Sequence, residues 1–212
     1  EMFADFALDE KIIAIFDAEF DKQEILFFTE SGFVKKTEFK EYEVQKAYFQ
    51  AVKIKEDDQV IAAMFDQPNT NMIFATKDGQ VLFAKKDDVP IQGRISGGVR
   101  GINLNDKDKV VFATICSDDG EIIVVTKLGF TKRVLISQID KLPRYRKGVR
   151  LVGLGKDDYV LFATRCTLPV EIVFDYNTTF MKNSEDIQIE QRMTKGKKQK
   201  GEGELKGVYV AN

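Results

Sequence analysis

The stretch Glu121-Ile-Ile-Val-Val-Thr-Lys-Leu-Gly-Phe-Thr-Lys-Arg133 decides the fold of this chain. It places a β-branched apolar run before a polar turn that contains Gly129, and a second short run follows the turn. β-branched residues favour strands, and glycine readily adopts the positive φ that tight turns between strands require. The stretch therefore predicts a β-hairpin.

The same hairpin pattern occurs three more times. The other copies are Glu24–Lys36, Asn71–Phe83 and Glu171–Asn183. Gly32 and Gly79 occupy the position of Gly129, whereas the fourth copy has Thr179 there. Because a β-branched residue tolerates positive φ poorly, we expect the fourth turn to be altered or strained.

A second pattern precedes each hairpin: a charged turn that leads into a short apolar run. Runs 1 to 4 begin near Ile12, Val60, Val110 and Val160, at steps of 48, 50 and 50 residues. One hairpin-based unit cannot bury both faces of its sheet, so its neighbours must cover them. The chain is therefore predicted to be all-β, a closed or nearly closed propeller-like disc of about four blades, each of about 50 residues. Residues 1–212 would form one domain; an elongated β-solenoid is the alternative.

Composition narrows the functional classes. The chain has 43% hydrophobic residues, two cysteines and no histidine, and its apolar runs are far shorter than a membrane span. Without histidine there is no Cys/His metal site, and the commonest general base is absent. We therefore expect no catalytic residue, no metal, no cofactor and no membrane contact. A cytoplasmic location is expected, and the opening Glu1–Met2 is interpreted as the start of a fragment of a longer protein.

Several polar residues recur at repeat positions. The pairs Asp57–Asp58 and Asp157–Asp158 precede runs 2 and 4, where we expect turn residues in preference to paired catalytic carboxylates. Cys116 and Cys166 also share a repeat position, for which packing is the expected role.

A polar linker follows each hairpin. We call these segments linker 1 (Tyr42–Ile54), linker 2 (Ile91–Ile102), linker 3 (Leu142–Leu151) and linker 4 (Ile189–Val208). Linkers 2 to 4 interleave glycines with Arg and Lys, while linker 1 is neither glycine-rich nor strongly basic. Glycines let a loop lie close to a surface, and the cations can contact phosphates.

Linkers 2 to 4 therefore contain the candidate DNA-binding residues, although a solvated charged surface is the alternative for any single loop. The candidates are Arg94, Arg100, Arg144, Arg146, Lys147, Arg150, Arg192, Lys195, Lys197 and Lys198. The basic pairs at the hairpin ends, Lys35–Lys36, Lys85–Lys86 and Lys132–Arg133, are weaker candidates, because lysines also protect exposed strand edges.

Apolar hairpins ending in Thr-x-x-Gly-x-x-Lys-Arg, as in Thr126–Arg133, followed by basic glycine-rich linkers, resemble one family over essentially the whole chain. That family is the C-terminal domain of the A subunit of bacterial type II topoisomerases, DNA gyrase and topoisomerase IV. The resemblance implies a β-pinwheel, in which adjacent blades exchange strands and double-stranded DNA lies on the outer rim. It also implies a non-catalytic domain of an ATP-dependent enzyme. The expected partners in the bacterial nucleoid are the ATPase B subunit, together with the remainder of the A subunit.

The resemblance also bears on two residues of the linkers. The family's nucleophile is a Tyr next to an Arg, but Tyr145 beside Arg144 lies in a repeat linker and is expected to be a loop aromatic. Gyrase carries the motif Gln-Arg-Arg-Gly-Gly-Lys-Gly in one blade. Here Gln191-Arg-Met-Thr-Lys-Gly-Lys197 matches only its first two positions without a shift.

This degenerate motif favours topoisomerase IV over gyrase. The expected function is therefore to bend and guide the transported DNA segment more than to wrap it tightly. The alternative is a propeller-like protein–protein docking platform without DNA binding, which the net charge of −2 suits.

Overall fold

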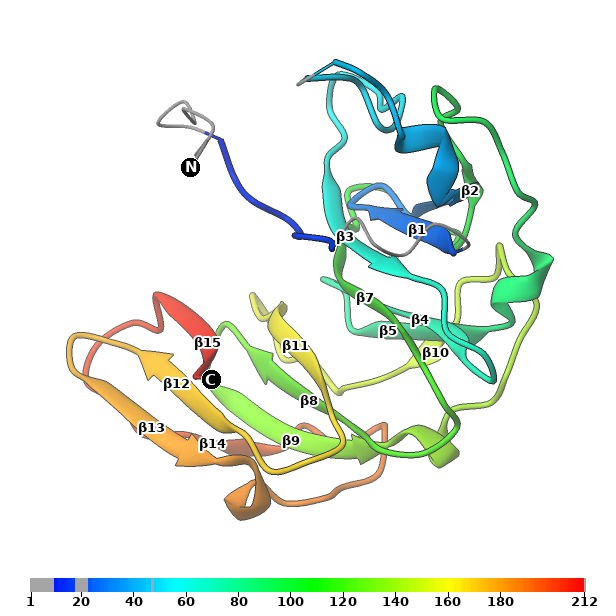
Figure 1. Ribbon diagram of the computed structural model, residues 1–212. Coiled ribbons are helices and arrows are strands. Elements are labelled where there is room, and N and C mark those ends of the chain that lie inside the picture. Colours follow the sequence, from blue (N-terminus) through cyan, green and yellow to red (C-terminus); the bar gives the residue numbers. More distant parts are fainter. Residues whose placement is uncertain (1–9, 18–22, 47, 212) are drawn as a thin grey trace.

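Short strands and 3-10 turns make up the regular structure of the computed structural model, which describes residues 10–17, 23–46 and 48–211. The strands form four antiparallel sheets, which we number as blades 1 to 4 along the chain. The four blades follow one another around an arc (Figure 1). The all-β prediction and the four-bladed β-pinwheel are confirmed.

The strand order within the blades differs from the order along the chain. Blade 1 contains, in spatial order, β3 (Val60–Phe65), β1 (Glu24–Thr29), β2 (Phe33–Glu38) and β6 (Val99–Arg100). Blade 2 contains β10 (Val149–Arg150), β5 (Gln80–Ala84), β4 (Asn71–Thr76) and β7 (Val110–Cys116). Blade 3 contains β11 (Val160–Cys166), β8 (Glu121–Thr126), β9 (Phe130–Leu135) and β14 (Lys197–Lys198). Blade 4 contains β13 (Thr179–Asn183), β12 (Glu171–Asp175) and β15 (Gly207–Ala211).

Each of the first three blades draws its strands from two successive repeats. A hairpin is flanked on one side by the apolar run of the next repeat and on the other side by the linker of that next repeat. In blade 1, for example, β3 comes from run 2 and β6 from linker 2. A blade is therefore not one 50-residue repeat but a hairpin completed by its successor, which is the strand exchange that the family resemblance implied.

A 3-10 turn leads out of each hairpin. The four turns are η1 (Phe39–Tyr42), η2 (Lys86–Asp88), η3 (Ile136–Gln138) and η4 (Ser184–Asp186). The turns η2 to η4 redirect the chain from the hairpin toward the outer edge of the preceding blade, where linkers 2 to 4 lie in extended conformation.

The turns within the hairpins follow the glycine pattern. Gly32, Gly79 and Gly129 have φ of 81°, 77° and 82°. In the fourth hairpin Thr179 instead begins β13 and pairs with Asp175, and it is not among the residues with positive φ. The fourth turn is thus altered, as expected, but not strained at this residue.

An aspartate at the start of each exchanged run holds that run to its hairpin. The Oδ1 atoms of Asp58, Asp108 and Asp158 accept hydrogen bonds from backbone N–H groups of the hairpin turns at 2.9, 2.9 and 3.0 Å. The turn role expected for Asp58 and Asp158 is confirmed, and Asp108 adds the third copy.

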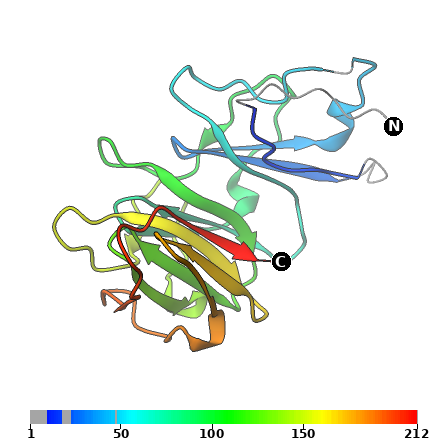
Figure 2. The same ribbon diagram turned by 90° about the vertical axis from the view of Figure 1, so that its left-hand side faces the viewer.

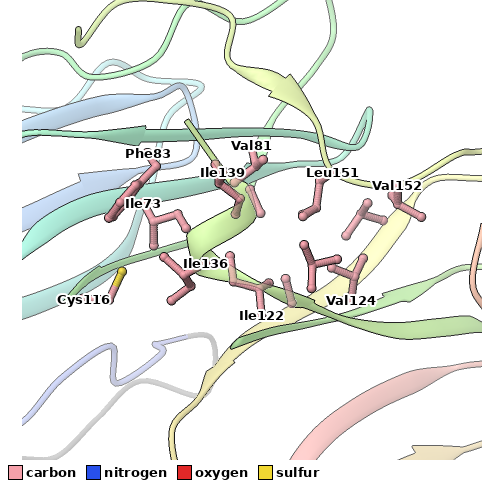
Figure 3. Close-up of a cluster of buried hydrophobic side chains, with 14 residues drawn as sticks. Ile73, Val81, Phe83, Cys116, Ile122, Val124, Ile136, Ile139, Leu151 and Val152 are labelled. Carbon is pink, nitrogen blue, oxygen red and sulfur yellow. The ribbon is translucent and has the colours of Figure 1, made fainter. Parts of the chain in front are cut away.

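The blades pack face to face through apolar side chains. Phe28 of blade 1 meets Phe74 of blade 2 edge to face, with ring centroids 5.4 Å apart. Between blades 2 and 3, side chains including Ile73 and Ile122 meet in one fully buried cluster (Figure 3). Each such side chain contributes about 1.5–3 kcal/mol on burial, so neighbouring blades depend on one another for stability.

Both cysteines belong to these interfaces between blades. Cys116 and Cys166 are buried and form no disulfide, which confirms their packing role. Burial raises the pKa of the Cys116 thiol to about 11, so this sulfur stays protonated and unreactive at neutral pH.

The two ends of the repeat array differ. β15 pairs with β12 and supplies blade 4 with the run that a next repeat would provide. Residues 10–17 form no strand and cross the side of the arc between blade 4 and blade 1 (Figures 1 and 2), where Phe16 packs on Phe65 at 4.8 Å between ring centroids. Residues 1–9, where the first copy of the repeat pattern begins, lie outside the described residues. Among the described residues, no helix combines the length and hydropathy needed to cross a bilayer.

Candidate nucleic-acid interface

Linkers 2 to 4 occupy the same place on three successive blades. β6 pairs with β2, β10 pairs with β5, and β14 pairs with β9, so each linker forms the outer edge strand of the preceding blade. The three basic loops of the sequence are therefore equivalent in space as well as in repeat position. We call linkers 2 to 4 together the rim band.

Glycine allows each linker to approach its blade closely. Gly98, Gly148 and Gly196 have φ of 80°, 80° and 84°. A Cβ at these positions would lie 2.5, 2.2 and 2.7 Å from carbonyl oxygens of β2, β5 and β9. No other residue fits this seat without moving the edge strand.

Neighbouring linkers are joined by hydrogen bonds. Arg144 Nη1 donates to the carbonyl of Arg100 at 3.1 Å, and Arg192 Nη1 donates to the carbonyl of Arg150 at 3.1 Å. The backbone N–H of Tyr145 also donates to the carbonyl of Gly101 at 2.6 Å. The rim band is thus continuous across blades 1 to 3, and the ten candidate cations lie along it.

Three of the ten cations donate side-chain hydrogen bonds to the backbone of the preceding linker. Arg94, Arg144 and Arg192 are half-buried, and each Nη1 donates to a carbonyl of the preceding linker. One guanidinium carries five N–H donors, so each of these arginines keeps N–H groups that can donate hydrogen bonds to a phosphate. This structural role was not predicted from the sequence, although the recurrence of Arg in the fourth or third position of each linker is visible there.

The other seven cations are exposed. They are Arg100, Arg146, Lys147, Arg150, Lys195, Lys197 and Lys198. Three of them lie over aromatic rings at the blade edge. Arg100 is 5.2 Å from the centroid of Phe33, and Lys195 and Lys198 are 3.9 and 5.9 Å from that of Phe130. Within the described ranges, none of the ten candidate residues forms an ion pair with a carboxylate.

Lys36, Lys86 and Arg133 at the hairpin ends are different. Lys36 pairs with Glu24 at 3.1 Å, Lys86 pairs with Asp66, and Arg133 pairs with Glu121 at 2.8 Å. Lys36 and Lys86 are also buried. These residues are neutralised inside the blades, so they do not belong to the interface, and protection of strand edges does not explain them.

Two buried lysines anchor the rim band from below. Lys132 Nζ donates to the carbonyls of Gln191, Arg192 and Thr194 at 2.8, 2.7 and 2.8 Å. At the equivalent place in blade 1, Lys35 Nζ donates to the carbonyl of Arg94 and, at 2.8 Å, to that of Ala51.

Burial lowers the pKa of both Lys35 and Lys132 to about 8, and the neighbouring Arg94 and Arg192 act in the same direction. At neutral pH both amines remain charged and hold the loop carbonyls. In blade 2 the corresponding residue is Leu82, which packs in the apolar cluster with Leu142 of linker 3. The signal for this anchoring role was that Lys35 and Lys132 stand at inward-facing positions of their strands. From the sequence alone, they were only weak candidates for DNA contact on the surface.

Linker 1 lies outside the rim band. Its described residues form no strand, and Lys53 N–H donates to the carbonyl of Ser96 in linker 2 at 3.1 Å. Beside it is an open apolar groove of about 1000 Å³, lined by residues 10–16 together with Tyr48, Val52 and Ile54. Linker 1 therefore lies beside an apolar groove, whereas linkers 2 to 4 expose basic side chains.

Known proteins share this architecture. The sequence matches the family "DNA gyrase C-terminal domain, beta-propeller" over residues 23–65, 70–117 and 120–167. It is 36% identical over 102 residues to the A subunit of DNA topoisomerase 4 from Bacillus subtilis (strain 168), a match that covers 46% of this chain and 13% of that protein. It is 34% identical over 97 residues to the A subunit of DNA gyrase from Metamycoplasma arthritidis (strain 158L3-1), covering 45% of this chain and 11% of that protein.

Solved structures give the same result. The "Crystal structure of the C-terminal domain of DNA topoisomerase IV" superposes with a TM-score of 0.86 at 27% identity, covering 97% of this chain and 67% of the other. The "Structure of DNA gyrase A C-terminal domain" superposes with a TM-score of 0.75 at 20% identity, covering 90% of this chain and 66% of the other, and so supports the fold alone. The matched regions span only about one seventh of the length of the curated relatives. Exchanged strands, matching repeats and these similarities lead to one conclusion: the chain belongs to the family of DNA gyrase C-terminal domains with a β-propeller fold.

Proposed function

We propose that this domain binds double-stranded DNA along the rim band and bends it. One observation carries the proposal: ten basic side chains lie in one band across three blades, without carboxylate partners among the described residues, in a chain whose net charge is −2. Elsewhere in the described blades, cations such as Lys36 and Arg133 are paired with acids. Positive charge left unneutralised on one edge attracts a polyanion regardless of the net charge.

The chemistry of the band favours binding without sequence specificity. Arg and Lys contact phosphate oxygens, which carry no sequence information, and each contact releases counterions from the duplex. A duplex that follows the linkers from blade 1 to blade 3 would have to follow the arc of the blades, and this requires it to bend.

The relatives suggest the larger context of this activity. Because several of them are A subunits of topoisomerase IV or gyrase, we place this domain in the A subunit of a bacterial type II topoisomerase. There it would guide the transported DNA segment toward a cleavage site in the remainder of that subunit, and the ATPase B subunit would be a further partner.

Topoisomerase IV is the preferred assignment over gyrase. In linker 4, Met193 and Thr194 stand where the gyrase motif has Arg and Gly, so the motif found in gyrase is degenerate here. Ligation of nicked plasmid in the presence of the domain tests this assignment: a bending domain leaves the linking number almost unchanged, whereas a wrapping domain shifts it with one handedness.

A salt titration tests DNA binding itself. With the seven exposed cations each neutralising one phosphate, log K should fall with log salt at a slope of about −6. Affinity for a fluorescent duplex, measured by anisotropy, should therefore drop about 10⁴-fold between 50 and 200 mM salt. Affinity that does not depend on salt, or no binding at 50 mM, contradicts the proposal.

The apolar groove beside linker 1 favours a second function, protein docking. Its lining includes Ile12 and Tyr48, which are 56% and 72% exposed, and exposed apolar surface of this kind often marks a protein contact. We propose that its occupant is the remainder of the A subunit. Substitution of Ile12 and Ile15 by Ser should weaken association with the separately expressed remainder of that subunit, whereas DNA affinity should stay unchanged.

A further inference from the structure

At one shared repeat position, three residues before the glycine of the seat, each basic linker exposes a large apolar side chain. Ile95, Tyr145 and Met193 are 59%, 50% and 73% exposed. Each directly follows Arg94, Arg144 or Arg192, the arginines that hold neighbouring linkers together. We call these three residues the apolar tips. A single exposed hydrophobic residue is ordinary, but recurrence at one position on three successive blades requires an explanation.

The tips are held in place by the surrounding structure. On the N-terminal side of each tip, an arginine side chain is hydrogen-bonded to the carbonyl of the preceding linker. On the C-terminal side, the glycine seat fixes the edge strand. Tyr145 itself has φ of 63°, and its N–H donates to Gly101. These contacts limit the freedom of the loops, so the apolar side chains stay exposed instead of folding back onto the blade.

The neighbours of the tips are cationic. Arg146 and Lys147 follow Tyr145, and Lys195 lies two residues after Met193. Arg100 lies 5.9 Å from the centroid of the Tyr145 ring. An apolar side chain flanked by cations complements a duplex, in which phosphates border a groove floored by bases and sugars. This arrangement does not suit an apolar protein surface, because burial of the flanking charges there would be costly.

We propose that Ile95, Tyr145 and Met193 insert into the minor groove of a duplex bound on the rim band and act as wedges that bend it. This inference rests on the proposed DNA binding and adds its mechanism. Apolar side chains that enter the minor groove partly unstack base steps and kink the duplex. With one tip on each of three blades, the bend is distributed along the arc. Flexible TA and CA/TG steps should therefore be preferred over stiff A-tracts.

The test compares the wild-type protein with the triple variant I95S/Y145S/M193S. Bending is measured by energy transfer between dyes at the two ends of a duplex, unstacking by the fluorescence of 2-aminopurine at TA steps, and affinity by anisotropy. We expect the variant to lose at least half of the change in energy transfer, the rise in 2-aminopurine fluorescence and the preference for TA steps. Affinity should fall about three- to tenfold, while the salt slope stays constant because no phosphate contact is removed.

Two control variants separate wedging from other effects. L168S/M181S/Y209S removes three exposed apolar side chains, 75%, 64% and 56% exposed, from outside the rim band; its binding and bending should match the wild type. R100Q/R150Q/K197Q removes one exposed cation from each linker and should reduce the salt slope by about 3. At saturating concentration this second control should still bend the duplex.

The outcomes distinguish this inference from the proposed function. If I95S/Y145S/M193S binds DNA with unchanged energy transfer and 2-aminopurine fluorescence, the wedge is overturned and DNA binding stands. If the wild-type protein does not bind duplex DNA, both are overturned. Should the triple variant fail to fold, M193S alone, at the most exposed tip, should lose part of the bend; an unchanged bend in M193S also overturns the wedge.

Discussion

Linker 1 and linkers 2 to 4 hold the same position in the repeat but differ in structure. Linkers 2 to 4 each form the edge strand of the preceding blade, while linker 1 forms no strand in its described part. At the 50-residue step, Tyr48 corresponds to Gly98 and Gly148, and Val44 corresponds to Arg94 and Arg144. Linker 1 therefore lacks both the glycine that allows close approach to a strand and the arginine that joins one linker to the next.

This difference shows that the position of a linker is set by its pairing with the hairpin of the preceding repeat. The Cβ of any residue at the glycine seat would lie within 2.2–2.7 Å of a strand carbonyl, so a tyrosine such as Tyr48 cannot occupy it. A linker without the seat glycine, such as linker 1, does not pair with a hairpin in its described part, so its other residues need not match those of linkers 2 to 4. Linkers 2 to 4 lie on blade edges and expose basic side chains, whereas linker 1 lies beside the apolar groove.

The largest expected effect comes from reversing charge in one linker of each kind. R146E/K147E/R150E in linker 3 removes three exposed phosphate contacts and adds repulsion, so DNA affinity at 100 mM salt should fall by roughly 10²–10³-fold. K46E/K53E/K55E, in and beside linker 1, changes the net charge equally and should reduce affinity less than about threefold. Anisotropy measures both. If both variants lost DNA affinity equally, linker 3 would not differ from linker 1 in its contribution to DNA binding.

The glycine seat can be tested within linker 2. G98A places a Cβ 2.5 Å from the carbonyl of Val34 at φ of +80°, and we expect it to lower the free energy of unfolding by about 2–3 kcal/mol. G93A meets nothing closer than 4.0 Å and should be neutral or slightly stabilising. Urea unfolding measures both. A neutral G98A would show that the edge strand adapts and that Tyr48 does not exclude linker 1 from such a seat.

The buried Lys132, which holds linker 4, gives the rim band a pH dependence. Its pKa is about 8 in the folded protein, against the ordinary 10.5 in the unfolded chain. Between these pH values the unfolded state binds more protons, so stability rises with pH by at most about 1.4 kcal/mol per pH unit.

The difference in unfolding free energy between wild type and K132L should therefore shift in favour of the wild type from pH 8 to pH 10.5. Urea titrations across this range measure the shift. A pH-independent difference would mean that Lys132 titrates at its ordinary value.

The smallest expected effect concerns loop order. K132L copies the leucine of blade 2 but leaves the carbonyls of Gln191, Arg192 and Thr194 without their donor. The cations of linker 4 should then be less well positioned, and DNA affinity should fall about three- to fivefold, in line with the loss of about one hydrogen-bond contribution. L82M in blade 2, which removes no donor, is the control. Faster amide exchange confined to residues 191–196 in K132L would localise the effect.

Much of the fold was readable from the residues. The hairpins around Gly32, Gly79 and Gly129 and the four-fold repeat follow from short-range patterns of β-branched residues and turn glycines. The basic linkers were also visible, and the structure brings all ten candidate cations into one band; their contact with DNA stays a prediction. The buried lysines and the structural arginines were missed, because a cation in a strand or loop has the same local pattern whether it faces solvent or a cage of carbonyls.

The sequence by itself determined the repeat, the strands and the position of each basic linker, since these depend on neighbours a few residues apart. Only the tertiary structure decided which hairpin each linker completes, which cations are neutralised, and that Ile95, Tyr145 and Met193 are held outward on successive blades. Those features depend on contacts between residues that lie far apart in sequence, such as Lys132 with Arg192 and Gly148 with Val81. Local propensity carries no information about such pairings; the packing of one blade against the next creates them.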